Sequence, residues 1–443
     1  MAKPLTYDQL LSAVSGRAAG LRTLTKLQPA GGPGTKVFPP TYEGAAYATE
    51  HRRLPSHDDP VPCVLLDSVQ SQANRMEEAL QHAYDRGELG DAGLPLVEVD
   101  FGPFYPGEDQ DESMRLIDPV GRISSLQAPH RIADAILRDS VSADDGRTPF
   151  RQTAEGQRLA QANVGNATPL FELCPTALLF GLWDSTGPKG GLGAKFERAI
   201  VSEIVGVGAE YGVKTSSRID PLGIQLAAGP VYVAKDPSGI GWTADPEQAK
   251  KKGGKPIEIG KKGGKPSEVN HGNVTPSISE RDRNTGEYLA GGVTIDHAEH
   301  SIVISLTALR RLRFPLDGQP YDARDPKQHA RDDAARAALA AMGVLAATLA
   351  TAGGMDLRSR CLLWPDDAAQ DWQLLAGPGL AEDFTPDADS ALKLFEDAVA
   401  AAKKAGLPWR TEALTLAPSD ALVKIVAKSQ GLAAASGGDE EGG

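Results

Sequence analysis

The sequence is poor in cysteine and in aromatic residues, and each shortage excludes a class of protein. Its 443 residues contain three cysteines, Cys63, Cys174 and Cys361, which are far apart and form no CxxC pair. Neither a disulfide framework nor a zinc cluster is supported, and a reducing, cytoplasmic environment fits best. Aromatic residues make up 5% of the chain, and the aromatic-rich motif that stacks RNA bases on the sheet of an RNA-recognition motif (RRM) is absent.

The usual signatures of nucleotide pockets and hydrolases are missing as well. No GxxxxGK[ST] loop occurs, no GxGxxG follows an expected strand, and HExxH and GxSxG are absent. Two clusters contain residues of the types that bind metal ions. One is Asp296, His297, Glu299 and His300, and the other is His51, His57, Asp58 and Asp59. If residues 292–306 form strands, His297 and His300 point to opposite faces, which weakens a shared site. We expect no metal and no cofactor, with a spatially assembled hydrolase site as an alternative.

Targeting signals are also lacking. The N-terminus has no basic start followed by an apolar run, so we expect a cytoplasmic rather than an exported protein. Residues 337–355 are uncharged and long enough to suggest a membrane span, but Ala, Gly and Thr dominate them. Leu339, Met342, Leu345 and Leu349 recur there at helical spacing, which predicts a buried core helix and no membrane contact.

Length and charge set broad limits on the fold and on its partners. A chain of this length predicts two or three domains, or one core with long insertions. The 48 glycines and 32 prolines indicate many irregular connections. The net charge of −13 argues at first against a nucleic-acid partner. The basic residues nevertheless cluster along the sequence, and a local cluster is what such binding needs.

A strand–helix–strand pattern occurs twice along the chain. The first copy has an apolar run, an amphipathic stretch and an alternating run at residues 61–67, 68–86 and 94–101. The second copy has strands, a long helix and a further strand at residues 292–295, 301–306, 327–352 and 358–364. Two such halves in one antiparallel sheet, with helices on one face, predict an α+β fold of the RRM-like, or ferredoxin-like, type.

We therefore expect a palm domain that insertions interrupt. The expected segments are a lead-in with an N-terminal helix at 1–60, palm halves at 61–101 and 292–365, and insertions at 102–291. After the second palm half we expect a C-terminal region at 366–433, with helices around 388–404 and 419–428. A disordered acidic tail is expected at 434–443.

The start of the expected helix at 68–86 is polar without being acidic. Free N–H groups and the positive end of the helix dipole suit a phosphate or sugar there. The candidate contacts are Ser68, Gln70, Gln72, Asn74 and Arg75. From this helix alone, the favoured interpretation is simpler: Ser68 caps the helix, and Arg75 pairs with a neighbouring glutamate.

Residues 168–222 combine glycines, cations and hydroxyls. We expect a strand at 176–183, a glycine-rich turn at 185–193, and a helix from about residue 194 with Lys195 and Arg198 on one face. The further candidates are Lys189 in the turn and Lys214, Ser216, Ser217 and Arg218 after the helix. Backbone amides, cations and hydroxyls in this order suit a groove that follows a phosphate backbone without contacting bases.

The hexapeptide KKGGKP occurs at residues 251–256 and again at 261–266. A possible nucleic-acid loop is formed by Lys250, Lys251, Lys252, Lys255, Lys261, Lys262 and Lys265. We expect the interleaved glycines to prevent a stable helix or strand. A solvated flexible loop and a mobile arm that folds onto phosphate are equally compatible with this pattern.

Four blocks, at residues 65–80, 168–185, 195–206 and 214–224, resemble signature blocks of one family. It is the type I-G (formerly I-U) CRISPR-associated RAMP family, the Cas-seven-type backbone subunit of Cascade, and the similarity spans about residues 20–430. The resemblance implies an RRM-like palm with finger and thumb insertions. It also implies copies of the chain in a helical filament along CRISPR RNA (crRNA), where they grip the sugar-phosphate backbone and present the spacer to target DNA in antiviral defence.

The partners that this resemblance implies are crRNA, target DNA in an R-loop, further copies of the chain, a fused Cas-five/Cas-six-type subunit, the Cascade large subunit and a recruited helicase-nuclease. No catalysis is expected in this subunit. Carried over onto this sequence, the guide contacts are Gln70, Asn74, Arg75, Lys189, Lys195, Arg198, Lys214, Ser216, Ser217 and Arg218. Two alternatives stay open, an endoribonuclease of the RAMP superfamily that processes CRISPR RNA and a metal-dependent hydrolase.

Overall fold

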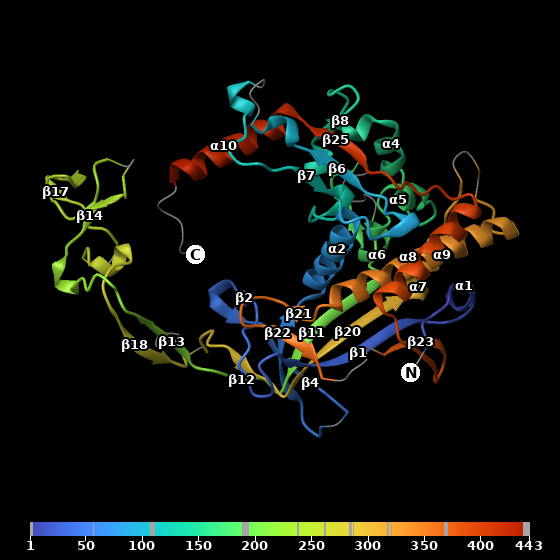
Figure 1. Ribbon diagram of the computed structural model, residues 1–443, viewed down its shortest axis with the longest axis horizontal. Helices are drawn as coiled ribbons and strands as arrows, with labels where there is room; N and C mark the ends of the chain where they lie inside the picture. Colours follow the sequence, from blue (N-terminus) through green and yellow to red (C-terminus); the bar gives the residue numbers. More distant parts are fainter. Residues whose placement is uncertain are drawn as a thin grey trace. The chain divides into compact units, whose positions relative to one another are not determined.

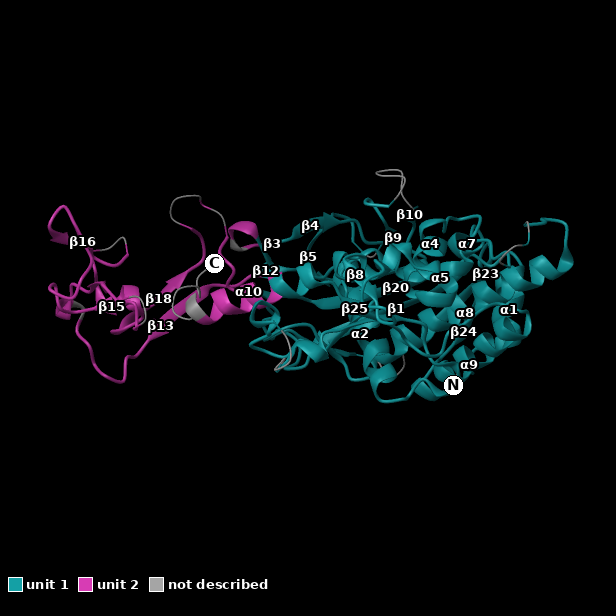
Figure 2. Ribbon diagram, turned by 90° about the horizontal axis from the view of Figure 1, so that it is seen from above, with its two compact units in different colours: residues 1–42, 47–210, 293–424 teal, residues 43–46, 211–292, 425–443 magenta. Residues whose placement is uncertain are grey.

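The chain forms two compact units in a computed structural model. The structure describes residues 3–55, 57–106, 111–187, 195–236, 239–260, 263–282, 286, 288–316, 319, 321–366 and 371–436. The first unit comprises residues 1–42, 47–210 and 293–424, and the second comprises 43–46, 211–292 and 425–443 (Figure 2). The first unit is thus assembled from separate stretches of the chain.

A large antiparallel sheet lies at the centre of the first unit (Figure 1). Its path among the described residues runs β21 (Met355–Asp356), β22 (Leu362–Pro365), β1 (Gly20–Pro29), β20 (His297–Ser305), β11 (Ile200–Val207), β5 (Val61–Asp67) and β4 (Thr49–Arg52). Beside β1, β23 (Trp372–Gly377) extends the sheet and pairs in turn with β24 (Leu380–Phe384).

The centre of this sheet has the ferredoxin-like strand order. Strand β1 comes first along the chain, helix α2 (Val69–Asp85) precedes β11, β20 follows, and helix α8 (Pro326–Thr351) lies between β20 and β22. In space, β22, β1, β20 and β11 lie side by side and antiparallel, so the order is fourth, first, third, second. The predicted α+β class is confirmed, and β5 is an additional strand beside β11.

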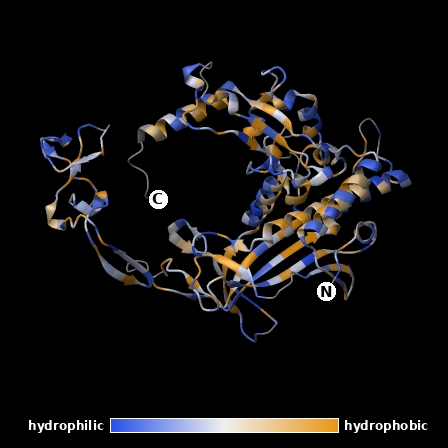
Figure 3. Ribbon diagram, viewed as in Figure 1, coloured by the Kyte–Doolittle hydropathy of each residue, from blue (hydrophilic) through white to orange (hydrophobic). Residues whose placement is uncertain are grey.

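Strand β20 shows how the sequence pattern builds this layer. Its even-numbered residues Ala298, His300, Ile302 and Ile304 are buried, while the odd-numbered residues are half-buried or exposed. The alternation of period two therefore puts one face of the sheet against the helices and leaves the other open. Figure 3 shows the same alternation of colour along the central strands.

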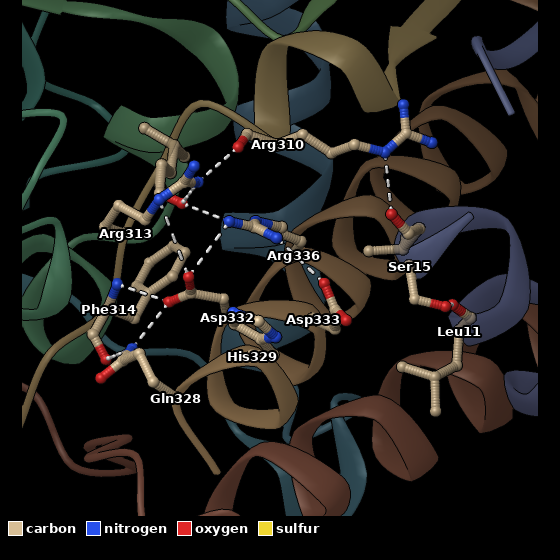
Figure 4. Close-up of polar contacts among 12 residues, drawn as sticks. Leu11, Ser15, Arg310, Arg313, Phe314, Gln328, His329, Asp332, Asp333 and Arg336 are labelled. Carbon is tan, nitrogen blue, oxygen red and sulfur yellow. Dashed lines mark hydrogen bonds and ion pairs between the residues drawn. The ribbon is translucent and has the colours of Figure 1, made fainter. Parts of the chain in front are cut away.

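Helix α8 is the predicted core helix. By length and composition it could cross a membrane, but 83% of its most apolar window is buried inside the protein. Near its N-terminal end, the buried carboxylate of Asp332 accepts hydrogen bonds from the Phe314 N–H at 2.9 Å and the Gln328 amide at 2.9 Å (Figure 4). Arg336 donates to the same carboxylate at 3.2 Å. These contacts fix the segment before α8 against the helix.

One expected palm strand belongs to a different sheet. The run at 94–101 contains β6 (Val97–Asp100), which lies between β7 (Arg122–Ser124) and β25 (Leu414–Pro418) in a sheet completed by β8 (Ser140–Ser142). The prediction that the strand at 94–101 belongs to the palm is therefore wrong. An alternating pattern predicts a strand but not its partner, and β6 pairs in parallel with β25, more than 300 residues away. The palm strand is instead β1, which lies within the expected lead-in at 1–60.

The strand expected before residue 190 is mostly a helix, and the helix expected after it is replaced by two strands. The run at 176–183 forms helix α6 (Thr176–Phe180) followed by the short strand β9 (Leu182–Trp183), and the segment expected to be a helix contains the strands β10 (Lys195–Phe196) and β11. Apolar runs of this length fit either period, and β-branched Ile200, Val201 and Ile204 favour the strand.

The second unit contains short strand pairs. Strand β13 (Lys214–Arg218) pairs with β18 (Val274–Ser279), and β14 (Tyr232–Val233) with β15 (Trp242–Thr243). The first KKGGKP copy forms a hairpin of β16 (Lys251–Lys252) and β17 (Lys255–Pro256). Its glycines do not prevent strands, contrary to our expectation, because Gly253 and Gly254 sit in the turn with φ of 59° and 80°, where glycine is favoured.

The C-terminal helices are confirmed as α9 (Ala388–Lys404) and α10 (Asp420–Ser436), and α10 continues into the tail that we expected to be disordered. Residues 437–443 of that tail lie outside the described residues. The other elements are α1 (Tyr7–Ser15), α3 (Ala135–Arg138), α4 (Ala154–Ala160), α5 (Thr168–Leu173), α7 (Leu306–Leu309), β2 (Thr41–Tyr42), β3 (Ala46–Tyr47), β12 (Glu210–Tyr211) and β19 (Val293–Thr294).

Candidate nucleic-acid interface

A groove of about 660 Å³ on the first unit brings several predicted residues together. It lies where α2, the segment at 129–138, the end of α6 and the β9–β10 pair meet. Among the side chains that line it are Gln70, Asn74, His130, Arg131, Arg138, Trp183, Asp184, Lys195 and Arg198. Four of the predicted contacts, Gln70, Asn74, Lys195 and Arg198, thus share one surface although more than 100 residues separate the two pairs.

The charges of the groove do not balance. Arg131 pairs with Glu77 and Arg138 with Asp139, while the lining acid Asp184 pairs with Arg151. Among the described residues, no carboxylate lies within ion-pair distance of the two other lining cations, Lys195 and Arg198. These two charges leave the groove positive despite the acidic chain as a whole, which is the local clustering that phosphate binding needs.

Arg198 experiences this excess of positive charge directly. Its Nε donates to the Phe180 carbonyl at 3.2 Å, which fixes the side chain along the groove wall. Burial, and after it the nearby charge of Arg131, lowers the pKa of Arg198. Glu77 opposes this shift, and an anion bound in the groove would stabilise the charged guanidinium further.

Arg131 is the most firmly held cation of the groove, and no sequence pattern pointed to it. Its Nε and Nη2 donate to the two oxygens of Glu77, each at 2.7 Å, and its Nη1 donates to the Gly181 carbonyl at 3.0 Å. The backbone of Arg131 has φ of 53°, which is uncommon for a residue other than glycine. Such a conformation persists only where surrounding contacts impose it. No sequence pattern pointed to His130 or Arg138 either, because neither an irregular segment nor the four-residue helix α3 shows a period.

Gly181 connects the two arginines of the wall. Its φ is 91°, and a Cβ at this position would lie 2.8 Å from the Arg198 Cγ. Any larger residue would push the Arg198 side chain aside, while the Gly181 carbonyl holds Arg131. The glycine therefore allows the two guanidinium groups to share one wall.

Three of the predicted contacts at the start of α2 make hydrogen bonds or ion pairs within the protein. Ser68 caps the helix by accepting from the Ser71 N–H at 3.2 Å. Gln72 is buried and donates to Asp67 at 2.7 Å, and Arg75 pairs with the same carboxylate at 2.9 Å. The predicted nucleic-acid contact of Gln72 is wrong because its side chain is inside the protein. The favoured simpler interpretation of Ser68 is confirmed, and Arg75 pairs with a buried aspartate rather than with a neighbouring glutamate.

The buried network around Asp67 continues to His300. Gln72 accepts from the Ser202 hydroxyl at 3.0 Å, and that hydroxyl lies 2.9 Å from the His300 Nε2. Arg358 adds a second guanidinium to Asp67 at 3.1 Å. The network ties β5, α2, β11 and β20 together, so we assign it to stability rather than to binding.

We expect the stability of the protein to depend on the pH through His300. Burial lowers the pKa of His300 from 6.5 to about 4, so the stability that the neutral ring contributes is present above pH 6.5 and is lost as the pH falls through about 4. The loss amounts to roughly 3 kcal/mol. Urea unfolding at several pH values should show a flatter profile for His300→Gln, whereas His51→Gln, at an exposed position on β4, should keep the wild-type profile. Equal profiles for wild type and His300→Gln would contradict this assignment.

The remaining predicted contacts belong to the second unit. Lys214 and Ser217 on β13 are exposed, Ser216 lies 2.8 Å from Ser277 through their hydroxyls, and Arg218 donates to the Gly272 carbonyl at 2.8 Å. The lysines of the KKGGKP region that the structure describes, Lys250, Lys251, Lys252, Lys255 and Lys265, are exposed, and Lys251 pairs with Glu247. Lys189, Lys261 and Lys262 lie outside the described residues.

The open face of the central sheet is a second possible surface, but its charges are mixed. Lys26 on β1 is paired in register with Glu299 on β20, and Glu203 on β11 binds Arg52 at 2.8 Å. Phosphate binding requires an excess of cations. The groove provides such an excess and the sheet face does not.

The two groups of metal-ligand residue types do not form a metal site. His300 is buried while His297 lies on the other face of β20, as alternation predicted, and His51, His57, Asp58 and Asp59 are exposed. Within the part of the chain that the structure describes, no three His, Cys, Asp or Glu side chains are placed to hold a metal ion.

The fold and the groove define an α+β protein with RRM-like strand order and a positively charged surface groove. A family model described as "CRISPR-associated protein GSU0053 (Cas_GSU0053)" matches residues 21–211. This range includes all of β1 except Gly20, the whole of α2 and every residue that lines the groove. The match indicates a CRISPR-associated protein, in agreement with the coarser part of the resemblance. Among curated proteins, none matches this chain in sequence.

Proposed function

We propose that this chain is the type I-G Cas-seven-type backbone subunit of Cascade, which assembles in several copies along crRNA and presents the spacer to target DNA. The observation that carries the proposal is the groove, in which Lys195 and Arg198 have no acidic partner among the described residues. The groove lies within the segment that is similar to a CRISPR-associated family.

The chemistry of the groove fits a protein that does not itself read sequence. Two cations, an exposed histidine and the exposed amides of Gln70 and Asn74 can hold phosphates and sugars of any sequence. In RNA-guided recognition, base pairing between guide and target supplies the specificity. The subunit therefore needs a firm hold on the RNA backbone and no sequence-specific contacts.

The proposal includes the absence of catalysis in this subunit and a cytoplasmic complex. Its partners would be the fused Cas-five/Cas-six-type subunit, the large subunit, the recruited helicase-nuclease and further copies of the chain. Buried ionisable groups such as Asp67, Glu77 and His300 are engaged in structural contacts, which supports a binding rather than a catalytic role.

The direct test is the nucleic acid that accompanies the protein. The full chain is expressed with its neighbouring subunits and a CRISPR array, the complex is purified, and its nucleic acid is extracted. We expect one discrete RNA of guide length, which disappears when the array is omitted. Recovery of no discrete RNA would contradict the proposal, and cleavage of repeat RNA by this chain alone would favour the endoribonuclease.

A further inference from the structure

Trp183 is placed at the groove as an exposed aromatic surface. Its relative exposure is 60%, and that of Trp364 on β22 is 56%, whereas Trp372 and Trp409 are buried. An indole of this size usually contributes to a core or an interface, so its exposure beside a charged groove requires an explanation. Trp183 lines the groove, where it contributes a large apolar surface next to cations.

The short β9–β10 pair determines the direction of Trp183. Trp183 is paired in register with Lys195, and Leu182 is paired with Phe196. Leu182 and Phe196 are buried, while Trp183 and Lys195 are exposed. Cross-strand partners in register point to the same side of a ribbon, so the indole and the ammonium group stand next to each other on the outer face.

The acid next in sequence does not disturb this arrangement. Asp184 is bound by Arg151, whose Nη2 lies 2.8 Å and 2.9 Å from its two oxygens. The negative charge beside Trp183 is thereby neutralised. The indole is left with a cation on the facing strand and with Arg198 as a further lining cation.

We infer that Trp183 is a stacking platform for one unpaired base of the bound RNA, with Lys195 on an adjoining phosphate. This inference rests on the proposed function and adds a base contact to a groove that the sequence predicted to hold the backbone alone. Stacking on an aromatic ring accepts every base, because each base has a π-face, so the contact is compatible with guides of any sequence. It would define the position of one nucleotide in each copy of the chain.

The test compares two single-stranded probes of equal length, an oligouridine RNA and a ribose-phosphate chain without bases. The purified full chain should bind oligouridine more tightly than the chain without bases. Trp183→Leu should bind oligouridine about tenfold to hundredfold more weakly than wild type and should bind the chain without bases equally well. Trp183→Phe should keep most of the affinity because it keeps an aromatic face. The dependence of binding on salt should be the same in all three proteins, since no charge changes.

The possible outcomes separate this inference from the proposed function. If wild type and Trp183→Leu bind oligouridine equally, or if the variant loses affinity for both probes to the same extent, the stacking role is wrong and RNA binding stands. If the wild-type chain binds neither probe, both proposals fail. Thermal unfolding of each variant confirms that the comparison is made between folded proteins.

Discussion

The double variant Lys195→Ala/Arg198→Ala is expected to bind single-stranded RNA about 100-fold more weakly than wild type. Each substitution removes one charge-assisted contact with phosphate. Two such contacts of about 1.5 kcal/mol each account for a loss of this size. The slope of log affinity against log salt should become shallower by about 1.4, because each phosphate contact on a single strand contributes about 0.7. Filter binding of oligouridine at several salt concentrations measures both quantities.

The matched control removes the same charge from another surface. Arg22 and Lys26 are exposed on β1, on the open face of the central sheet. We expect Arg22→Ala/Lys26→Ala to keep the wild-type affinity and salt slope. A larger loss in this control than in the groove variant would assign RNA binding to the sheet face instead.

The second large effect concerns the buried pair of Arg131 and Glu77. Replacing Arg131 with Met leaves Glu77 without its partner inside the protein and should lower the free energy of unfolding by about 3–5 kcal/mol. The double variant Glu77→Leu/Arg131→Met should recover most of this loss, because it leaves no unpaired buried charge. Urea unfolding of the three proteins measures the interaction by a double-mutant cycle.

The pH distinguishes an unpaired charge from a simple packing defect. Burial raises the pKa of Glu77 from 4.5 to about 7, although Arg131 opposes the shift. Folding therefore takes up a proton between these values, and the contribution of this group to stability falls as the pH rises through about 7. Removing Arg131 favours the protonated form of Glu77 further. The loss of unfolding free energy in Arg131→Met should therefore be larger at pH 8 than at pH 5. A deficit that is independent of pH would mean that lost packing causes it.

Helix α2 shows what could be predicted from sequence. Its capping residue Ser68 and its amphipathic pattern gave its bounds almost to the residue, because both signals are local. The pattern did not distinguish Gln72 and Arg75 from Gln70 and Asn74. All four are polar, and only the folded chain shows that the first two face the buried carboxylate of Asp67.

The groove shows where sequence reasoning fails. Lys195 and Arg198 were chosen as phosphate contacts on an expected helix, yet one lies on β10 and the other lies just before β11. Both still line the groove, and their prediction as phosphate contacts depends on charge rather than on period. Arg131 and Trp183 could not be found in this way, because their placement depends on pairing between separate segments, such as Arg131 with Gly181 and Trp183 with Lys195.

The central claim, that the groove holds the guide RNA, is tested most directly by photo-crosslinking. A complex assembled on crRNA with a photoreactive base is irradiated, and the crosslinked peptides are identified by mass spectrometry. The account predicts crosslinks in the peptides that contain residues 130–138 and 183–198. Crosslinks confined to β1, β20 and β22 on the open sheet face, with the groove peptides unmodified, would contradict it.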